Sequence, residues 1–347
     1  MIDLESANLG ELELRELELC LKGGVVSTRG ALTQQFESEM AKYLGVQPEN
    51  VLATNSGTAA LYLSLRQVVA LQSEAIILPV LTFIASANAI AQGGKALKFV
   101  DVDQKTWCID FTKIEENCFS TILGVNLYGN ICNWSKLLSH CCCLIEDACE
   151  SLGVQTRCAN LINYSCYSFN GNKVMTTGGG GMLVGEKQSI LIARMIASQG
   201  IYEGNCFTPG FNYRMPALNA SLGLAQLKRL PEFLAKKKRI NTIYRNELSN
   251  LCTFQEPGEE GLHSYWYSAG TFKIPAEILQ LKLKEKGIPT RRIFKPIPLE
   301  PAYHFEGAEN QFPIAKWIYD YGLCLPSGTI NRDMDIFETC KTIKTIL

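Results

Sequence analysis

The chain has 347 residues, of which 47% are hydrophobic and 19% are charged, and its formal net charge is −1. These values predict a soluble globular protein with one large and one smaller domain, and they do not favour a nucleic-acid-binding protein. The basic cluster from Lys236 to Arg239 lies in a helical pattern beside Glu232. Such a pattern favours a solvated helix face over a patch that binds nucleic acid.

The cysteines and histidines predict neither disulfides nor a metal site. Cysteines lie in apolar runs such as HCCCLIEDAC, no two have the CxxC spacing, and His140, His263 and His304 are scattered along the chain. Free thiols in apolar runs behave as small hydrophobic residues and suit a reducing compartment. The sequence shows neither a signal peptide nor a long apolar span, so we expect a cytoplasmic protein without a membrane segment.

Apolar segments rich in Val, Ile and Leu alternate with helical patterns along the first two thirds of the chain. This alternation predicts an α/β fold in which helices cover both faces of a mostly parallel sheet. Two helices are expected before the first strand, at 10–24 and 31–45. The expected strands lie at 50–54, 75–80, 96–103, 121–127, 143–148 and 180–185, and the helices between and after them at 57–69, 84–94, 111–119, 133–141 and 188–200.

The pattern changes after about Pro231. A long charged helix, a strand-like segment at 263–274 and a helix at 276–287 predict a smaller α+β domain. We therefore expect a large domain over 1–230 and a small C-terminal domain over 231–347.

The segment SFNGNKVMTTGGGG, from Ser168 to Gly181, places one lysine, Lys173, in a polar turn before four glycines. The chain contains neither GxGxxG nor GxxxxGK, so the two common phosphate-binding loops are excluded. Glycines directly before a strand let the backbone turn sharply or pass close to another group. Alternatively, Asn170-Gly171 is the turn of a simple β-hairpin.

Two other segments carry polar residues at the ends of predicted strands. In TNSGTAAL, from Thr54 to Leu61, a strand ends and a helix begins, and the free N–H groups of a helix start can bind an anion. An ordinary N-cap explains the same residues. In LIEDACESLG, Glu146 and Asp147 end an apolar strand at the edge of the sheet where ligands bind, although a solvated loop would also carry such acids.

An anion site, a strand-end aspartate and a turn lysine together meet the requirements of pyridoxal phosphate. This cofactor needs a site for its phosphate, a carboxylate for its pyridine nitrogen and an amine for its aldehyde.

With these motifs the chain resembles the DegT/DnrJ/EryC1/StrS sugar aminotransferases, which have the aspartate-aminotransferase-like fold (fold type I) and use pyridoxal 5'-phosphate. The resemblance runs from near Ser27 to the C-terminus, through TNSGTAAL, PVLTFIASANAI, FVDVD, IEDACESLG, SFNGNK, GGGGMLV, GFNYRMPALNASLGLAQL and CLPSG. The form SFNGNK has Asn170 where many relatives have histidine. It resembles the branch that aminates C4 of nucleotide-linked 4-keto-6-deoxy sugars, on routes to legionaminic acid, bacillosamine-type sugars and perosamine.

The resemblance implies roles around the cofactor ring. Lys173 would react with the cofactor aldehyde and later move the proton between substrate and cofactor, and Asp147 would face the ring nitrogen. Phe83 would stack on the ring, the alternative being an ordinary core aromatic. Glu150 stands beside the ring where many relatives have glutamine.

The resemblance also implies a site for the cofactor phosphate. Gly57, Thr58 and Ser168 would hold the phosphate, and Asn212 would reach the phosphate of a neighbouring subunit. We therefore expect a homodimer with shared active sites. Arg214, two residues after Asn212, would meet a substrate anion or form a structural ion pair.

The implied reaction moves an amino group from L-glutamate to C4 of a nucleotide-linked 4-keto-6-deoxy sugar. A UDP- or GDP-linked 2-acetamido sugar is favoured, in the biosynthesis of bacterial surface glycans or legionaminic- or bacillosamine-type sugars. The alternatives are an aminotransferase for nucleotide-linked 3-keto sugars, a non-catalytic binding or regulatory protein of the same fold, and a pyridoxal-phosphate-dependent lyase. The variable stretches 200–210 and 291–303 are expected to select the sugar.

Overall fold

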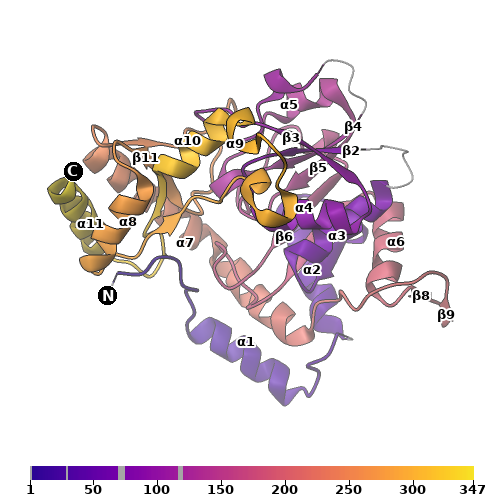
Figure 1. Cartoon of the computed structure of the whole chain (residues 1–347). Helices are drawn as coiled ribbons and strands as arrows, with labels where there is room; N and C mark the ends of the chain where they lie inside the picture. The colour runs from indigo at the N-terminus through magenta and orange to yellow at the C-terminus, as the bar shows by residue number, and fades with distance from the viewer. Residues whose placement is uncertain (1, 29, 69–74, 116–119) are drawn as a thin grey trace.

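The computed structural model describes residues 2–28, 30–68, 75–115 and 120–347. Its larger sheet has seven strands in the order β1-β7-β6-β5-β4-β2-β3 (Figure 1). The strands are β1 (Val51–Thr54), β2 (Ala75–Pro79), β3 (Ala96–Val100), β4 (Ser120–Val125), β5 (Cys141–Asp147), β6 (Tyr164–Ser168) and β7 (Gly181–Gly185). Strands β2 to β6 pair in parallel, and β7 is antiparallel to both β1 and β6. The predicted α/β fold with a mostly parallel sheet is confirmed.

Alternate residues of the central strands enter two different apolar clusters. In β2, Ile76 and Leu78 belong to one cluster and Ile77 to the other; in β4, Leu123 and Ile122 are divided in the same way. Side chains alternate between the two faces of a strand, so both faces of this sheet are buried. The continuous apolar runs of the sequence have this cause.

The helices before residue 200 lie close to where the sequence predicts them. They are α1 (Glu11–Lys22), α2 (Ala31–Leu44), α3 (Gly57–Val68), α4 (Ile84–Gln92), α5 (Trp134–Leu137) and α6 (Lys187–Ala197). The next helix, α7 (Ala217–Leu248), begins at Ala217, well before the long helix predicted from about Pro231.

The helix predicted at 111–119 is wrong in its described part. Only a 3₁₀ turn, Phe111–Lys113, forms there, with the side chain of Asp110 accepting a hydrogen bond from the backbone N–H of Thr112. Ile114 then adopts an extended backbone and is buried, so its side chain joins the apolar cluster instead of continuing a helix. Residues 116–119 lie outside the described residues.

The glycine run sets the connection between β6 and β7. Ser168 pairs with Gly181 at the ends of these antiparallel strands, and residues 169–180 connect them, so the two-residue hairpin at Asn170-Gly171 is wrong. A Cβ atom on Gly181 would lie 2.4 Å from the carbonyl carbon and oxygen of Ser56. Glycine at this position allows β7 to approach the start of α3, which is the close backbone contact predicted from the sequence.

The C-terminal part forms a second, four-stranded sheet with its own apolar core. The strand order is β10-β11-β13-β12, and all three pairs are antiparallel. The strands are β10 (Cys252–Phe254), β11 (Ser268–Phe272), β12 (Arg291–Arg292) and β13 (Gly322–Leu325), and the helices are α8 (Ala276–Glu285), α9 (Ala308–Gln311), α10 (Pro313–Tyr321) and α11 (Asp333–Ile346). One apolar cluster of this part includes residues from Ile240 to Ile343, whereas Ala269 of β11 and Cys324 of β13 belong to the cluster of the large sheet.

The expected boundary between 230 and 231 falls inside α7, which continues through Pro231. The N-terminal segment, residues 2–8, lies against the C-terminal part of the chain. The backbone N–H of Ser327 donates to the carbonyl of Leu4 at 2.8 Å, and that of Asp3 donates to the side chain of Asn331 at 2.8 Å. The two ends of the chain are therefore held together on the side of the smaller sheet (Figure 1).

The prediction of a solvated helix face for the basic cluster from Lys236 to Arg239 is wrong for Lys237 of α7. Its side chain is fully buried, and its Nζ lies 2.5 Å from Glu5 Oε2. The same amine donates to the backbone carbonyls of Trp266 and Ser327, each at 2.9 Å. Burial raises the pKa of Glu5 to about 8, although the charge of Lys237 opposes this shift. Lys237 thus ties the N-terminal segment to the inside of the protein.

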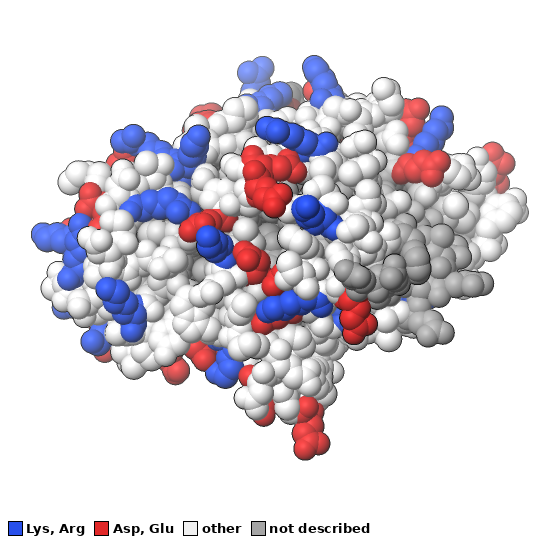
Figure 2. All heavy atoms as spheres, turned by 90° about the horizontal axis from the view of Figure 1, so that it is seen from above, with Lys and Arg blue, Asp and Glu red and all other residues white. Residues whose placement is uncertain are grey.

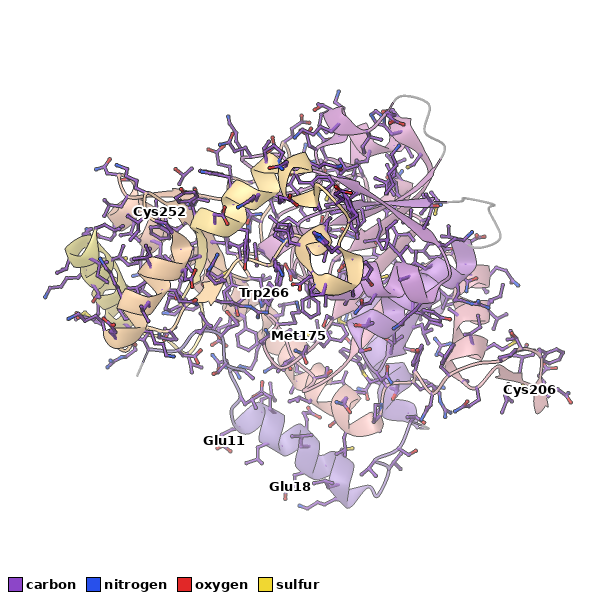
Figure 3. All side chains as sticks on the ribbon, in the orientation of Figure 1. Glu11, Glu18, Met175, Cys206, Cys252 and Trp266 are labelled. Atoms are coloured by element: carbon purple, nitrogen blue, oxygen red, sulfur yellow. The ribbon has the colours of Figure 1, made fainter. Side chains whose placement is uncertain are left out.

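Two elements project from the body in Figure 1: helix α1, and the hairpin of β8 (Ile201–Tyr202) and β9 (Asn205–Cys206). Cys206 marks the tip of this hairpin in Figure 3. On the hairpin and just after it, Ile201, Tyr202 and Phe207 are 47%, 43% and 65% exposed. These apolar side chains are uncovered in the single chain.

Charged side chains of both signs are interspersed on the face of the described protein shown in Figure 2. None of the helices in the described ranges combines the length and apolar character that a membrane-spanning helix needs. The cysteines whose side chains the structure describes are free thiols, and the described residues hold no group of three or more His, Cys, Asp or Glu suited to a metal ion.

Candidate active site

A cavity of about 300 Å³ lies at the carboxyl ends of the parallel strands, where the three sequence motifs meet. Its volume is within the range of ordinary small-molecule sites. The residues that line it are Asn55, Ser56, Gly57, Thr58, Leu61, Thr82, Phe83, Ala85, Val125, Asp147, Cys149, Glu150, Ser168, Asn170, Asn172, Lys173, Gly179, Gly180, Trp266, Arg291 and Phe294. All the residues that the resemblance assigns to the cofactor, except Asn212, are among them.

Lys173 enters the cavity from the turn that follows β6. Its backbone N–H donates to the carbonyl of Asn170 at 3.0 Å, which closes the turn. The Nζ atom lies 3.7 Å from the centre of the Trp266 ring and 3.6 Å from Glu150 Oε1. The indole Nε1 of Trp266 donates to the carbonyl of Asn172 at 2.6 Å, so the ring and the lysine turn are joined. The amine is thereby held at the cavity wall by an aromatic face and a carboxylate.

Asp147 ends β5 and points into the cavity from the sheet. The hydroxyl of Ser86 donates to Asp147 Oδ2 at 2.6 Å, and the backbone N–H of Cys149 donates to Oδ1 at 3.1 Å. The hydroxyl of Thr82 lies 3.2 Å from that of Ser86. These contacts fix the orientation of a carboxylate that is only 5% exposed. The sequence-based alternative, an acid on a solvated loop, is therefore wrong for Asp147.

Gly57 and Thr58 at the start of α3 and Ser168 at the end of β6 line one part of the cavity. The Ser56 hydroxyl accepts a hydrogen bond from the N–H of Ala59 at 3.1 Å and so caps the helix. A Cβ atom on Gly57 would lie 2.8 Å from Cys149 Sγ and 2.9 Å from Ser168 Cβ. Glycine at position 57 therefore allows the start of α3 to pack closely against Cys149 and Ser168. The N–H groups in the first turn of a helix have no intrahelical partner and can bind an anion. The N-cap is present, but it does not account for Gly57.

Phe83 and Asn212 lie at the opening rather than in the core. Phe83 precedes α4, is 49% exposed, and has its ring centre 5.5 Å from that of Phe294. The alternative of an ordinary core aromatic is wrong for Phe83. Asn212 is exposed and does not line the cavity of its own chain, but its backbone carbonyl accepts a hydrogen bond from Asn55 Nδ2 at 3.1 Å.

Arg214 lies close to Asn212. Its Nη2 donates to Asn212 Oδ1 at 3.4 Å, and its Nε is buried without a hydrogen-bond partner among the described residues.

Glu150 is buried beside Lys173. The backbone N–H of Tyr128, a residue with a positive φ of 56°, donates to Glu150 Oε2 at 2.7 Å. Burial raises the pKa of Glu150 to about 7, although the charge of Lys173 and the Tyr128 hydrogen bond oppose the rise. Glu150 can therefore gain or lose a proton near neutral pH.

The sequence motifs did not identify Trp266, Arg291 or Phe294 as part of the site. All three come from the C-terminal part, and Figure 3 shows Trp266 between the two halves of the molecule. Arg291 and Phe294 belong to the stretch that was expected to select the sugar. Trp266 lies in HSYWYSAGTFKI, which carried only a strand signal.

This arrangement fits pyridoxal phosphate. The start of α3, where Gly57 and Thr58 line the cavity beside Ser168, suits the phosphate, Asp147 suits the ring nitrogen, and the amine of Lys173 suits the aldehyde.

A comparison with known protein families gives one match that covers nearly the whole chain. Residues 7–344 match the DegT/DnrJ/EryC1/StrS aminotransferase family. The chain belongs to this family. The aminotransferase is 32% identical to the GDP-perosamine synthase of Caulobacter vibrioides, over 94% of this chain and 93% of that one. It is 28% identical to the dTDP-4-dehydro-2,3,6-trideoxy-D-glucose 4-aminotransferase of Saccharopolyspora spinosa, over 94% of this chain and 91% of that one.

A solved structure confirms the fold of the aminotransferase. The putative sugar aminotransferase Spr1654 from Streptococcus pneumoniae, in its PMP form, superposes with a TM-score of 0.90 at 22% identity, over 99% of this chain and 96% of that one. Spr1654 has also been solved in a PLP form. The predicted enzyme class and cofactor are confirmed: the chain is a pyridoxal-phosphate-dependent aminotransferase.

Proposed function

We propose that this enzyme moves an amino group from L-glutamate to C4 of a nucleotide-linked 4-keto-6-deoxy sugar, with a UDP- or GDP-linked 2-acetamido sugar favoured. The observation that carries the proposal is the meeting of Lys173, Asp147 and the α3 N-terminus in one cavity. The names of the relatives support the choice of C4, because they include a GDP-perosamine synthase and a sugar 4-aminotransferase. Such a reaction belongs to the cytoplasmic synthesis of activated sugars for surface glycans or legionaminic- or bacillosamine-type sugars.

The chain's own residues would hold the reacting groups and move one proton. Bound pyridoxal phosphate supplies an electron sink for the carbon that loses its proton. Asp147, oriented by Ser86 and the N–H of Cys149, would keep the ring nitrogen protonated. The amine of Lys173 would take the proton from the donor carbon and pass it to the cofactor.

The remaining residues of the proposal would hold the cofactor in place. The phosphate would lie against Gly57, Thr58 and Ser168, where the helix start offers N–H groups. Phe83, which is half exposed at the cavity, would cover the ring, and Glu150 would lie near the ring beside Lys173. Such contacts would hold the ring so that the donor carbon lies close to the Lys173 amine.

The test is an absorbance titration of the protein loaded with pyridoxal phosphate. L-Glutamate should remove the visible band of the bound cofactor, and one member of a panel of UDP-, GDP- and dTDP-linked 4-keto-6-deoxy sugars should restore it. Return of the band with a 3-keto sugar alone would contradict the choice of C4. A band that L-glutamate leaves unchanged would contradict the proposed donor.

A homodimer with shared active sites is the second part of the proposal. The apolar side chains of the β8–β9 hairpin and of Phe207 are exposed in the single chain, as is typical of a surface that binds another protein. Asn212 lies at the base of this hairpin beside the cavity residue Asn55. A second copy on this surface would bring its own Asn212 near the phosphate end of the cavity. The two-fold symmetry of such a contact makes each chain complete the other.

Replacing the most exposed of these side chains tests the dimer. Phe207→Asp should give a monomer in light scattering and weaken the retention of pyridoxal phosphate. Phe337→Asp is the matched control, since Phe337 is 44% exposed on α11, at the opposite end of the molecule. A Phe207→Asp protein that stays dimeric, or a monomeric wild type, would contradict this interface.

A further inference from the structure

Arg291 lines the cavity but has no part in the chemistry described above. Among the lining residues of the described chain, the basic side chains are those of Lys173 and Arg291. Lys173 faces Glu150, whereas no ion pair joins Arg291 to a carboxylate in the ranges that the structure covers. The wall of the cavity therefore contains a permanent positive charge that the protein does not neutralise.

The surroundings of Arg291 fix its side chain without using all its donors. Arg291 lies in β12 opposite Cys324 of β13. Its guanidinium carbon is 5.2 Å from the ring centre of Phe294, and the Tyr267 hydroxyl is close enough to affect its pKa. A guanidinium group has five N–H donors, so several remain for a ligand after these contacts.

The charge of Arg291 acts on the part of the cavity that holds Glu150. The Phe294 ring, which Arg291 contacts, stacks on the ring of Tyr128 at 5.3 Å, and the backbone N–H of Tyr128 donates to Glu150 at 2.7 Å. After the larger effects of burial, Lys173, Tyr128 and Asp147, the charge of Arg291 lowers the pKa of Glu150. Glu150 is in turn 3.6 Å from the amine of Lys173. Arg291 is therefore placed near the reacting amine, whereas the α3 N-terminus and Ser168 form the phosphate end.

We infer that Arg291 binds the α-carboxylate of the amino donor. This inference rests on the proposed function, since it concerns the donor of that same reaction. In an α-amino acid the carboxylate is bonded to the carbon whose proton Lys173 must take, so the anion lies beside the reacting centre. In a 4-keto sugar the reacting carbon bears no charged group, and the diphosphate is attached at the other side of the ring. A planar guanidinium with free donors matches a carboxylate, which it can hold with two parallel hydrogen bonds.

The neighbouring arginine provides a matched control. Arg292 is next in β12, and successive side chains of a strand point to opposite faces. Its Nη2 donates to the carbonyl of Tyr319 at 2.8 Å, and its guanidinium lies over the Tyr319 ring. Arg292 is not among the residues that line the cavity.

The experiment measures each half of the reaction separately, by stopped-flow absorbance of wild-type, Arg291→Gln and Arg292→Gln enzyme. Enzyme with pyridoxal phosphate is mixed with L-glutamate, with L-isoglutamine, which lacks a free α-carboxylate, or with L-glutamine, which keeps it. Enzyme with pyridoxamine phosphate is mixed with the accepted keto sugar. A catalytically inert donor analogue, 2-methylglutamate, is titrated by calorimetry to measure binding alone.

Loss of a charged, two-point contact should lower the efficiency of the glutamate half-reaction about 10- to 100-fold in Arg291→Gln. The sugar half-reaction should change less than about threefold. Wild-type enzyme and Arg292→Gln should prefer glutamate over isoglutamine by a similar 10- to 100-fold factor, and Arg291→Gln should lose this preference. The affinity of Arg291→Gln for 2-methylglutamate should fall by a similar factor. The ratio of the efficiency with glutamate to the efficiency with glutamine should be the same in wild-type and Arg291→Gln enzyme.

Equal losses in both half-reactions, or an unchanged preference over isoglutamine, would overturn the role of Arg291. If another L-amino acid converts the cofactor and glutamate does not, the proposed donor is wrong, and the same comparison is made with that acid and its α-amide. Donor identity and the role of Arg291 are then judged separately. If no amino acid converts the wild-type enzyme, both are refuted.

Discussion

Replacement of Lys237 by methionine should destabilise the protein although the two side chains have similar length. The amine of Lys237 makes four contacts within hydrogen-bond distance: two to the carboxylate of Glu5, at 2.6 and 2.5 Å, and one each to the carbonyls of Trp266 and Ser327. Its removal leaves a buried carboxylate and two buried carbonyls without this donor. Breaking one side of a buried ion pair costs about 3–5 kcal/mol. We expect the free energy of unfolding to fall by about 4 kcal/mol.

Urea denaturation followed by tryptophan fluorescence measures this loss. The double variant Glu5→Leu/Lys237→Met removes both charges, so its stability should recover to within about 2 kcal/mol of wild type. The single variant Glu5→Leu leaves the ammonium buried and should cost about as much as Lys237→Met. A Lys237→Met protein within about 1 kcal/mol of wild type, or a double variant in which the two losses simply add, would refute this reasoning.

Three further predictions concern the cavity. Lys173→Ala should fold and bind pyridoxal phosphate, but borohydride should no longer attach the cofactor to the protein in a mass spectrum, and transamination should be lost; substantial turnover would contradict the role of this lysine. Burial raises the pKa of Glu150 from 4.5 to about 7, so the cofactor-free wild type should lose up to about 3 kcal/mol of unfolding free energy relative to Glu150→Gln as the pH rises from 4.5 through 7, and parallel pH curves would contradict this. Gly181→Ala should weaken the affinity for pyridoxal phosphate at least about tenfold and lower the melting temperature, because its Cβ would lie 2.4 Å from Ser56, whereas Gly179→Ala, with nothing within 4 Å, should keep the wild-type melting temperature; equal melting temperatures of the two variants would contradict the argument.

The sequence was sufficient for the parts of the site that local chemistry determines. Asp147 ends a strand, Gly57 starts a helix and Lys173 lies in the turn after β6, and a parallel sheet brings such segments to one edge. The continuous apolar strands also predicted burial on both faces of the sheet. These features depend on short-range patterns, which one sequence displays directly.

Contacts between distant parts of the chain could not be predicted in this way. Trp266 reaches Lys173 from the C-terminal part of the chain, and nothing in HSYWYSAGTFKI indicates where its indole points. Lys237 belongs to a run of basic residues that is typical of a solvated helix, and only its contact with Glu5 explains why it is buried. The side of the cavity that we assign to the donor likewise depends on β12, a strand of two residues too short to give a periodic pattern.

The order of the strands also sets the time at which the cofactor can enter during synthesis. At one end of the large sheet, β1 pairs with β7. Val51 can therefore pair with Val184 only after the ribosome has added 133 more residues. Contacts over such sequence distances form slowly, and the neighbouring strand β6 also precedes β7 along the chain. The first turn of α3 meets Gly181 only when β7 is in place. A nascent chain that ends before β7 should therefore retain no pyridoxal phosphate, and the cofactor secures a sheet that the polypeptide has already assembled.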